Sequence, residues 1–165
     1  MFSPVIKLPF VFNNKNKSNY EPQNSSYVLF FDGCSKGNPG PGGAGAVLYK
    51  DGLEIWADSA YVGSKVTNNE SEYTGLVIGL SQAIKLGIQQ LNVHGDSLLV
   101  IKQMNGEYKV SSKNLLELYK TAKLLETHFE KVNYMHVYRE NNKRADQLSN
   151  EGLTRIVDNE NNTKN

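Results

Sequence analysis

The sequence predicts a single α/β domain with a five-stranded mixed sheet, antiparallel first and parallel later, flanked by helices. Three strand-like segments follow one another with turn residues between them, which is typical of an antiparallel meander. Helical apolar stripes then alternate with short strand-like runs, which favours parallel strands with helices packed on the sheet. The chain has 165 residues, 39% of them hydrophobic, so one domain can enclose a core.

The first three strands are predicted in the N-terminal half. SYVLFFDG (residues 26–33) is apolar on both faces, which is typical of a central strand. The run GNPGPGGAG (residues 37–45) has the composition of a turn. AVLYK and LEIWADSAYVG follow as strands, and the Asp51–Gly52 pair between them favours a tight hairpin turn.

Helices dominate the second half of the pattern. Apolar residues at helical spacing predict a helix over residues 71–86, and LNVHGD is the next strand. A short helix is expected from residue 98 to the Asn105–Gly106 pair, and an amphipathic helix over residues 114–129. VNYMHVY is the last predicted strand, and residues 143–157 form the last predicted helix.

Both ends of the chain differ in composition from this domain. Residues 1–25 are largely polar after a short apolar piece, VIKLPFVF, and are predicted to be a mobile extension. Residues 158–165 are polar and are predicted to be a disordered tail. The folded domain is therefore expected over residues 26–157.

Charge and cysteine content restrict the class of protein. The net charge is +1, so bulk charge indicates no polyanion partner. The single cysteine, Cys34, excludes an internal disulfide and fits a reducing, intracellular compartment such as the cytoplasm or nucleus. No apolar run approaches the ~20 residues that cross a bilayer, so no membrane association is expected. A monomer is the default expectation.

Acidic residues stand where a functional site would assemble. Asp32 and Asp96 end predicted strands, and Asp146 lies near the start of the last helix. Glu72 precedes Leu76 by four residues and so lies on the core-facing stripe of its helix. The carboxyl ends of strands in an open α/β sheet form the edge where sites assemble. We therefore expect these carboxylates to meet.

Each acid also has an ordinary structural explanation when taken alone. Asp32 can begin a turn, and Glu72 can close a capping box with Asn69. Asp96 can cap the helix that follows it, and Asp146 can be a solvated helix acid. The four positions together favour a shared site.

Such a site requires cations. Clustered carboxylates raise one another's pKa, and burial raises it further, unless a divalent cation is bound. Oxygen ligands without histidine or thiolate select hard ions such as Mg²⁺ or Mn²⁺. Two ions roughly 3.5–4 Å apart can clamp the attacking and leaving oxygens of a phosphodiester.

Four motifs in order, FDGCSKGNPGPGGAGAVL, TNNESE, HGDS and NKRADQLSNEGL, resemble those of type 1 ribonuclease H, and the similarity covers about residues 26–156. The resemblance implies a ribonuclease H-like fold. Residues 1–25 are too few and too polar for a hybrid-binding domain, so none is expected before the core. It implies that Asp32, Glu72, Asp96 and Asp146 hold two Mg²⁺ ions, with Mn²⁺ as a substitute. These would hydrolyse the RNA strand of an RNA–DNA hybrid and leave 5′-phosphate ends. Double-stranded RNA stays open as a second substrate.

The same resemblance suggests substrate contacts. Asn68 and Asn69 match residues that contact the hybrid in its minor groove, and Asn38 resembles another groove contact. Thr67, with Lys65, matches a region that grips a phosphate of the DNA strand. The ordinary alternatives are a helix N-terminus for the asparagine pair, a turn for Asn38 and a surface role for Lys65.

The chain departs from many bacterial members of the family at two places. The loop YRENNKRAD is short and lacks their histidine, as in archaeal and plant-type members. Arg139 is the candidate for that role, holding a phosphate or Asp146, and a surface salt bridge is the alternative. His136 is interpreted as a packed or exposed strand residue. The basic protrusion is also missing, and so we expect modest, salt-sensitive affinity.

Two other functions fit the same architecture. A binding module of this fold would grip nucleic acid without cutting it, but it should lack at least one of the four acids. A DNA-directed nuclease, such as an integrase or junction resolvase, would also use carboxylates. TNNESE and GNPGPGGAG resemble the hybrid-cleaving group instead.

Overall fold

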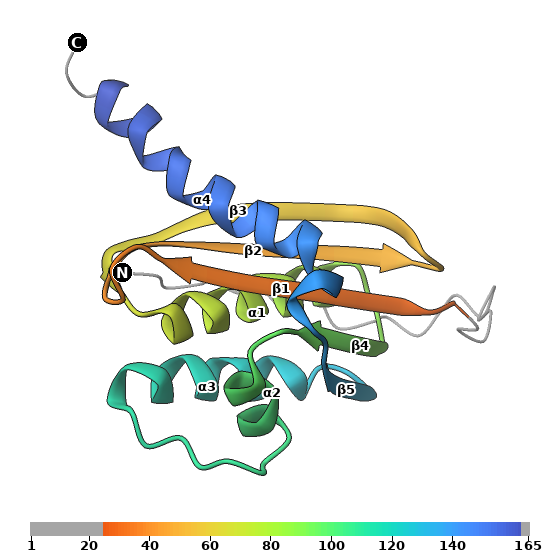
Figure 1. Cartoon of the computed structure of the whole chain (residues 1–165). Coiled ribbons are helices and arrows are strands. Elements are labelled where there is room, and N and C mark those ends of the chain that lie inside the picture. The colour runs from red at the N-terminus through yellow and green to blue at the C-terminus, as the bar shows by residue number, and fades with distance from the viewer. Residues whose placement is uncertain (1–24, 163–165) are drawn as a thin grey trace.

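The computed structural model describes residues 25–162, which form five strands and four α-helices (Figure 1). In chain order the elements are β1 (Tyr27–Ser35), β2 (Gly40–Lys50), β3 (Leu53–Val66), α1 (Asn68–Lys85), β4 (Gln90–Gly95), α2 (Leu98–Met104), α3 (Lys113–Glu126), β5 (Lys131–His136), a 3₁₀ turn (Arg139–Asn141) and α4 (Lys143–Asn162). The predicted extension lies outside the described residues up to position 24, as do residues 163–165.

The sheet has the order β3-β2-β1-β4-β5. β1, β2 and β3 pair antiparallel, whereas β4 pairs parallel with both β1 and β5. The predicted mixed sheet is therefore confirmed, with β1 at its centre. The hairpin turn at Asp51–Gly52 is also confirmed, because both residues have positive φ, +49° and +82°.

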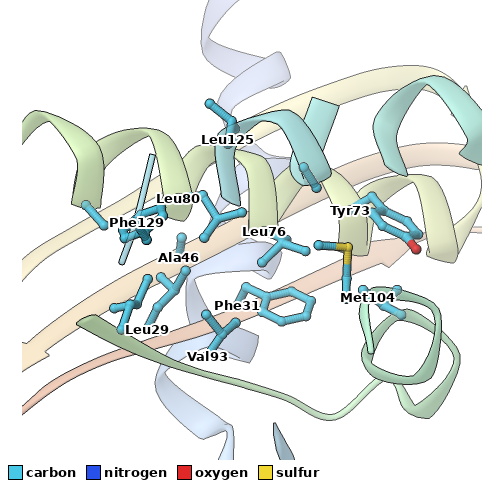
Figure 2. Packing of buried hydrophobic residues seen from close by; sticks show 14 of the residues in the cluster. Leu29, Phe31, Ala46, Tyr73, Leu76, Leu80, Val93, Met104, Leu125 and Phe129 are labelled. Carbon is cyan, nitrogen blue, oxygen red and sulfur yellow. The ribbon is translucent and has the colours of Figure 1, made fainter. Parts of the chain in front are cut away.

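Helices cover the two faces of the sheet unequally. α1 packs on one face, with α3 beside it, and α4 crosses β1, β2 and β3 on the other face (Figure 1). The main core lies on the α1 side, where Leu29 and Phe31 of β1 meet Tyr73 and Leu76 of α1 (Figure 2). The α4 side holds a smaller cluster of Val47, Ala145 and Leu148, with Phe30 packed against it.

The glycine-rich segment that was predicted as a turn is mostly strand. Only residues 36–39 form the connection, and β2 begins at Gly40. Its glycines allow helices to pack closely: a Cβ at Gly45 would lie 2.6 Å from the Cβ of Leu148 on α4. Local composition indicated a turn, whereas the close approach of a helix is what requires glycine here.

Two helix boundaries also differ from the prediction. α1 begins at Asn68, before the expected residue 71, because Thr67 caps it. α4 continues to Asn162, so residues 158–162 of the predicted disordered tail are helical. Among the described residues, no helix is long and apolar enough to cross a membrane.

Candidate active site

The register of two parallel strands places two acids side by side. The last aligned pair of β1 and β4 is Phe31 with Gly95, so Asp32 and Asp96 are the next residues at the same edge. The N–H of Gly33 donates to Oδ1 of Asp32 over 2.9 Å, which fixes one carboxylate oxygen. Asp32 is buried, with 5% of its surface exposed, and Asp96 is partly exposed.

Glycines bring the third acid to this edge. A Cβ at Gly33 would overlap the main chain at Ser71 and Glu72, and one at Gly75 would lie 2.6 Å from the main-chain O of Asp32. Helix α1 therefore packs directly on the backbone of β1, and Glu72 in its first turns reaches the end of the strand. Glu72 is 8% exposed, and its Oε2 has no hydrogen-bond partner among the described residues.

The three carboxylates form one cluster. One oxygen each of Asp32, Glu72 and Asp96 lie within 4.8 Å of one another. Burial, and then the charge of Asp96, raise the pKa of Asp32 to about 7. Burial, and then the charge of Asp32, raise the pKa of Glu72 well above its usual value. Without a cation this arrangement disfavours full ionisation.

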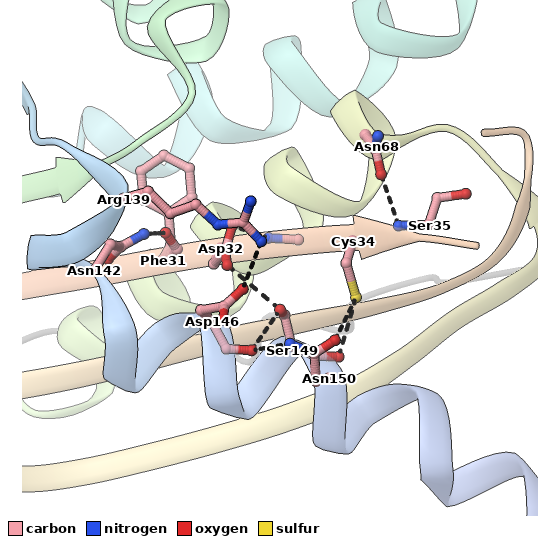
Figure 3. A network of polar contacts seen from close by, with 11 residues as sticks. Phe31, Asp32, Cys34, Ser35, Asn68, Arg139, Asn142, Asp146, Ser149 and Asn150 are labelled. Carbon is pink, nitrogen blue, oxygen red and sulfur yellow. Dashed lines mark hydrogen bonds and ion pairs between the residues drawn. The ribbon is translucent and has the colours of Figure 1, made fainter. Parts of the chain in front are cut away.

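Asp146 approaches the cluster from the opposite helix layer. It lies in the first turn of α4 and lines the same cavity as the other three acids, about 560 Å³ in volume. Ser149, one turn later, donates through Oγ to the main-chain O of Asp146 (2.9 Å) and lies 3.5 Å from Oδ2 of Asp32 (Figure 3). The structure thus brings the four predicted acids to one cavity. Three of them, Asp32, Glu72 and Asp96, are close enough for their oxygens to share one metal ion.

Capping does not account for Glu72 or Asp96. The capping box of α1 joins Thr67 and Glu70, whose backbone N–H groups each donate to the other's side chain. Helix α2 is capped by Ser97, whose Oγ accepts from the N–H of Val100. The alternative explanation for these two acids is therefore wrong, because neighbouring residues cap both helices.

The asparagines tie the β1–β2 connection to α1. The N–H of Ser35 donates to Oδ1 of Asn68 over 2.7 Å (Figure 3). The N–H of Asn68 donates to Oδ1 of Asn38 over 3.0 Å. Asn68 also lines the carboxylate cavity. Of the remaining predicted contacts, Asn69 is partly exposed and Lys65 is exposed at the end of β3, both outside the cavity wall.

Arg139 is highly exposed and approaches the last acid. Its guanidinium lies 3.9 Å from Oδ1 of Asp146, with 82% of the arginine side chain exposed (Figure 3). An ion pair this long and exposed contributes little stability. Arg139 is therefore free to contact a ligand of the cavity.

Sequence reasoning missed several residues of the cavity wall: Cys34, Ser35, His136 and Tyr138. His136 was interpreted as a strand residue without a site. Its Nε2 lies 3.2 Å from the main-chain O of Asp96, and its ring meets Tyr138 edge-on at 5.8 Å. The position of His136 at the end of its predicted strand could have indicated a site residue. β5 ends at the same sheet edge as β4, with Gly95 opposite His136.

Comparison with known proteins defines the class. The family described as reverse transcriptase-like matches residues 30–152. A ribonuclease H of Pseudomonas fluorescens is 36% identical over 150 residues, covering 79% of this chain and 92% of the relative. The chain belongs to the ribonuclease H family.

Two further matches place it within the family. A bifunctional protein of Mycobacterium tuberculosis is 43% identical over 127 residues, which cover 76% of this chain but 35% of that protein. The chain thus matches about a third of the length of its mycobacterial relatives. The structure of LC11 ribonuclease H1 in complex with an RNA/DNA hybrid aligns with a TM-score of 0.75 at 31% identity, over 80% of this chain and 99% of the other.

Proposed function

We propose that the protein is an endoribonuclease that hydrolyses the RNA strand of RNA–DNA hybrids and leaves 5′-phosphate ends. The observation that carries this proposal is the convergence of Asp32, Glu72 and Asp96 within 4.8 Å, in an open cavity that Asp146 also lines. The similarity to LC11 ribonuclease H1, which was solved with an RNA/DNA hybrid, supports the choice of substrate.

The residues present suit divalent cations. The cluster offers only carboxylate oxygens, and Oε2 of Glu72 is buried without a partner among the described residues. A hard dication satisfies such an oxygen and removes the repulsion that raises the pKa of Asp32. Asp32, Glu72, Asp96 and Asp146 would hold two Mg²⁺ ions, and Mn²⁺ would substitute. When bound, such ions supply positive charge that stabilises phosphodiester hydrolysis.

Side chains around the acids would orient the substrate. The Oδ1 atoms of Asn68 and Asn38 already accept backbone N–H groups, so their amide nitrogens remain to donate. Donors at this place suit the acceptors of a minor groove and the 2′-hydroxyl that distinguishes RNA from DNA. Arg139 is exposed beside Asp146 and suits a backbone phosphate.

The DNA-strand side of the substrate would be held by the start of α1. Lys65 lies at the end of β3, and Thr67 caps the N-terminus of this helix. Asn69 follows in its first turn. A helix N-terminus attracts phosphate through its free N–H groups. We place the monomeric enzyme in a reducing intracellular compartment, because its one cysteine, Cys34, is a free thiol.

A binding module without cleavage is the competing function. It predicts the loss of at least one acid, whereas all four occupy the cavity wall. The deciding experiment incubates the protein and Mg²⁺ with end-labelled RNA–DNA hybrid, double-stranded RNA and double-stranded DNA. We expect preferential cleavage of the RNA in the hybrid, with modest affinity that falls with salt.

The matched control for this assay is a pair of variants. Asp32→Asn should bind the hybrid without cutting it. Asp58→Asn changes an acid of β3 that pairs at 3.8 Å with Arg155 and should cut like the parent. Preferential cutting of duplex DNA would refute the substrate assignment, and tight hybrid binding without cleavage by the parent would establish the binding module.

A further inference from the structure

A second cleft lies on the α4 side of the sheet, beyond the active site. It has a volume of about 440 Å³ and shares no wall residue with the carboxylate cavity. Its floor is formed by Val28 and Phe30 of β1, Tyr49 of β2 and His94 of β4. The start of α4 and the 3₁₀ turn before it, residues 140–145, form the opposite wall.

The floor of this cleft is aromatic and only partly covered. The Phe30 ring meets Tyr49 edge-on at 5.7 Å and His94 edge-on at 4.9 Å, and all three side chains are partly exposed. Apolar surface that stays in contact with water costs free energy unless another group covers it.

A buried acceptor also lies in the cleft wall. Asn142 is 1% exposed and donates through Nδ2 to the main-chain O of Phe31 over 3.0 Å. Its Oδ1 is buried and has no partner among the described residues. Buried acceptors are normally paired. This oxygen is closed to solvent, so Asn142 joins the start of α4 to β1 behind the cleft and offers no contact to an occupant of the cleft.

The described chain begins at the rim of this cleft. Ser26 and Asp51 exchange two hydrogen bonds of 2.8 Å, from the N–H of Ser26 to Oδ1 of Asp51 and from the N–H of Asp51 to the O of Ser26. The next residue of the turn, Gly52, lines the cleft, as does Val28. The N-terminal residues therefore enter the fold next to the aromatic floor.

The N-terminal sequence contains a segment of matching chemistry. Residues 5–12 read VIKLPFVF, in which Lys7 is the only charged residue. A polar stretch, residues 13–25, connects this segment to β1. A tether of thirteen residues that behaved as a random coil would have a root-mean-square span of about 20 Å. That reach covers a cleft at the start of β1, and such a short tether gives a local concentration of about millimolar.

We propose that the apolar segment of residues 5–12 docks in the cleft between the aromatic floor and the start of α4. Its aromatic side chains cover Phe30, Tyr49 and His94. Exposed Glu140 on the opposite wall receives Lys7. Docking thereby holds the start of α4, which carries Asp146, through residues 140–145.

The first test locates the segment in the full-length protein. Phe12 is replaced with the photoreactive residue p-benzoylphenylalanine, the protein is irradiated, and cross-linked peptides are mapped by mass spectrometry. We expect intramolecular cross-links to the peptides that contain Phe30, Tyr49 or His94. The same replacement at Phe12 in a Val28→Lys background, where a lysine stands in the floor of the cleft, should give no enrichment of these peptides. Cross-links to another surface, a cross-linked dimer or no cross-link would overturn the proposal.

The second test measures coupling between segment and cleft. The double variant Phe10→Ala/Phe12→Ala should lower the melting temperature of the full-length protein by about 2–4 °C. The same double substitution should have no effect in a Val28→Lys background, because a lysine in the floor already prevents docking. Tyr20→Ala is the matched control and should leave the melting temperature unchanged. Equal losses in both backgrounds would show that the segment and the cleft do not interact.

Discussion

Two cavities that border β1 differ in chemistry although the residues that the strand contributes to them are two positions apart. Phe30 and Asp32 share one face of the strand, and Asn142 is hydrogen-bonded to Phe31 between them. Phe30 lies in an aromatic cleft, whereas Asp32 lies among carboxylates. Phe30 therefore contributes to stability, because buried apolar contacts stabilise a fold. Asp32 contributes to function at the expense of stability, because buried like charges destabilise a fold.

The largest expected effect comes from neutralising Asp32. Asp32→Asn should lower the rate of hybrid cleavage at least about a thousandfold, equivalent to about 4 kcal/mol, because it removes a ligand from the cluster. The measurement is initial cleavage rate at saturating Mg²⁺, with Asp58→Asn as the control. A rate equal to that of the parent would contradict the role of the carboxylate cluster.

The same variant should stabilise the metal-free protein. An acid whose folded pKa is raised stabilises the fold while protonated, and this contribution is lost as pH rises through the folded pKa. Asp32 has a folded pKa of about 7 against an ordinary 3.8, with Asp96, Glu72 and Asp146 as its charged neighbours. As the pH rises from about 4 to about 7, the parent in chelator should therefore lose stability relative to Asp32→Asn, by up to about 1.4 kcal/mol per pH unit, and the difference should level off above pH 7.

Urea unfolding of both proteins in chelator at several pH values measures this difference. The free energy of unfolding of the variant should exceed that of the parent by more at pH 7 than at pH 5, and saturating Mg²⁺ should reverse the order. A difference that does not change with pH would show that Asp32 is not strained by its neighbours.

The next largest effect is expected from disturbing the close packing of α1 on β1. Gly33→Ala places a Cβ against the main chain of Ser71 and Glu72, so the helix must move away from the strand. We expect a loss of about 3 kcal/mol in unfolding free energy and weaker binding of Mn²⁺, measured by denaturation and by calorimetry. Gly63→Ala is the control, because its Cβ would meet only a side-chain methyl of Val66 at 3.1 Å. Equal losses in the two variants would contradict this account of how Glu72 is positioned.

Replacing Phe30 should have a smaller effect on the free energy of unfolding, and of opposite sign to that of Asp32→Asn in the metal-free protein. Phe30→Ala removes a partly buried ring that contacts Tyr49 and His94, so the free energy of unfolding should fall by about 2 kcal/mol. Metal affinity should change little, because the ring does not line the carboxylate cavity. Loss of Mn²⁺ binding in a folded Phe30→Ala protein would show that the two cavities act as one.

His136→Ala should have the smallest effect. Its Nε2 contacts the main-chain O of Asp96, not a carboxylate. Turnover of the hybrid should therefore fall by less than about tenfold, below the range of general acid–base catalysis. A hundredfold loss, with a changed pH profile of kcat, would give His136 a role in proton transfer.

The sequence allowed the sheet and the four acids to be predicted because both depend on local signals. Apolar periodicity marked the strands and helices, and the acids stood at strand ends or on a core stripe. The glycine content of residues 40–45 predicted a turn, but these residues form a strand. Glycine is needed there because helices distant in sequence pack closely against the strand. The sequence also left capping open as an explanation for Glu72 and Asp96, because local patterns do not distinguish these residues from the actual caps, Thr67 and Ser97.

The wall of the cavity depended on long-range register and could not be predicted from local patterns. His136 and Tyr138 reach the site because β5 pairs with β4 to its last residue. Local patterns also could not predict that three of the acids lie closer together than the fourth, because this depends on how the helices pack on the sheet. Asp146 comes from the opposite helix layer and stands outside the tight cluster of the other three.

Anomalous diffraction from crystals soaked in Mn²⁺ tests the central claim most directly. The account predicts strong anomalous peaks in contact with the oxygens of Asp32, Glu72 and Asp96, and none at these positions in Asp32→Asn crystals. Ordered carboxylates without a peak between them, at Mn²⁺ concentrations that support cleavage, would contradict it.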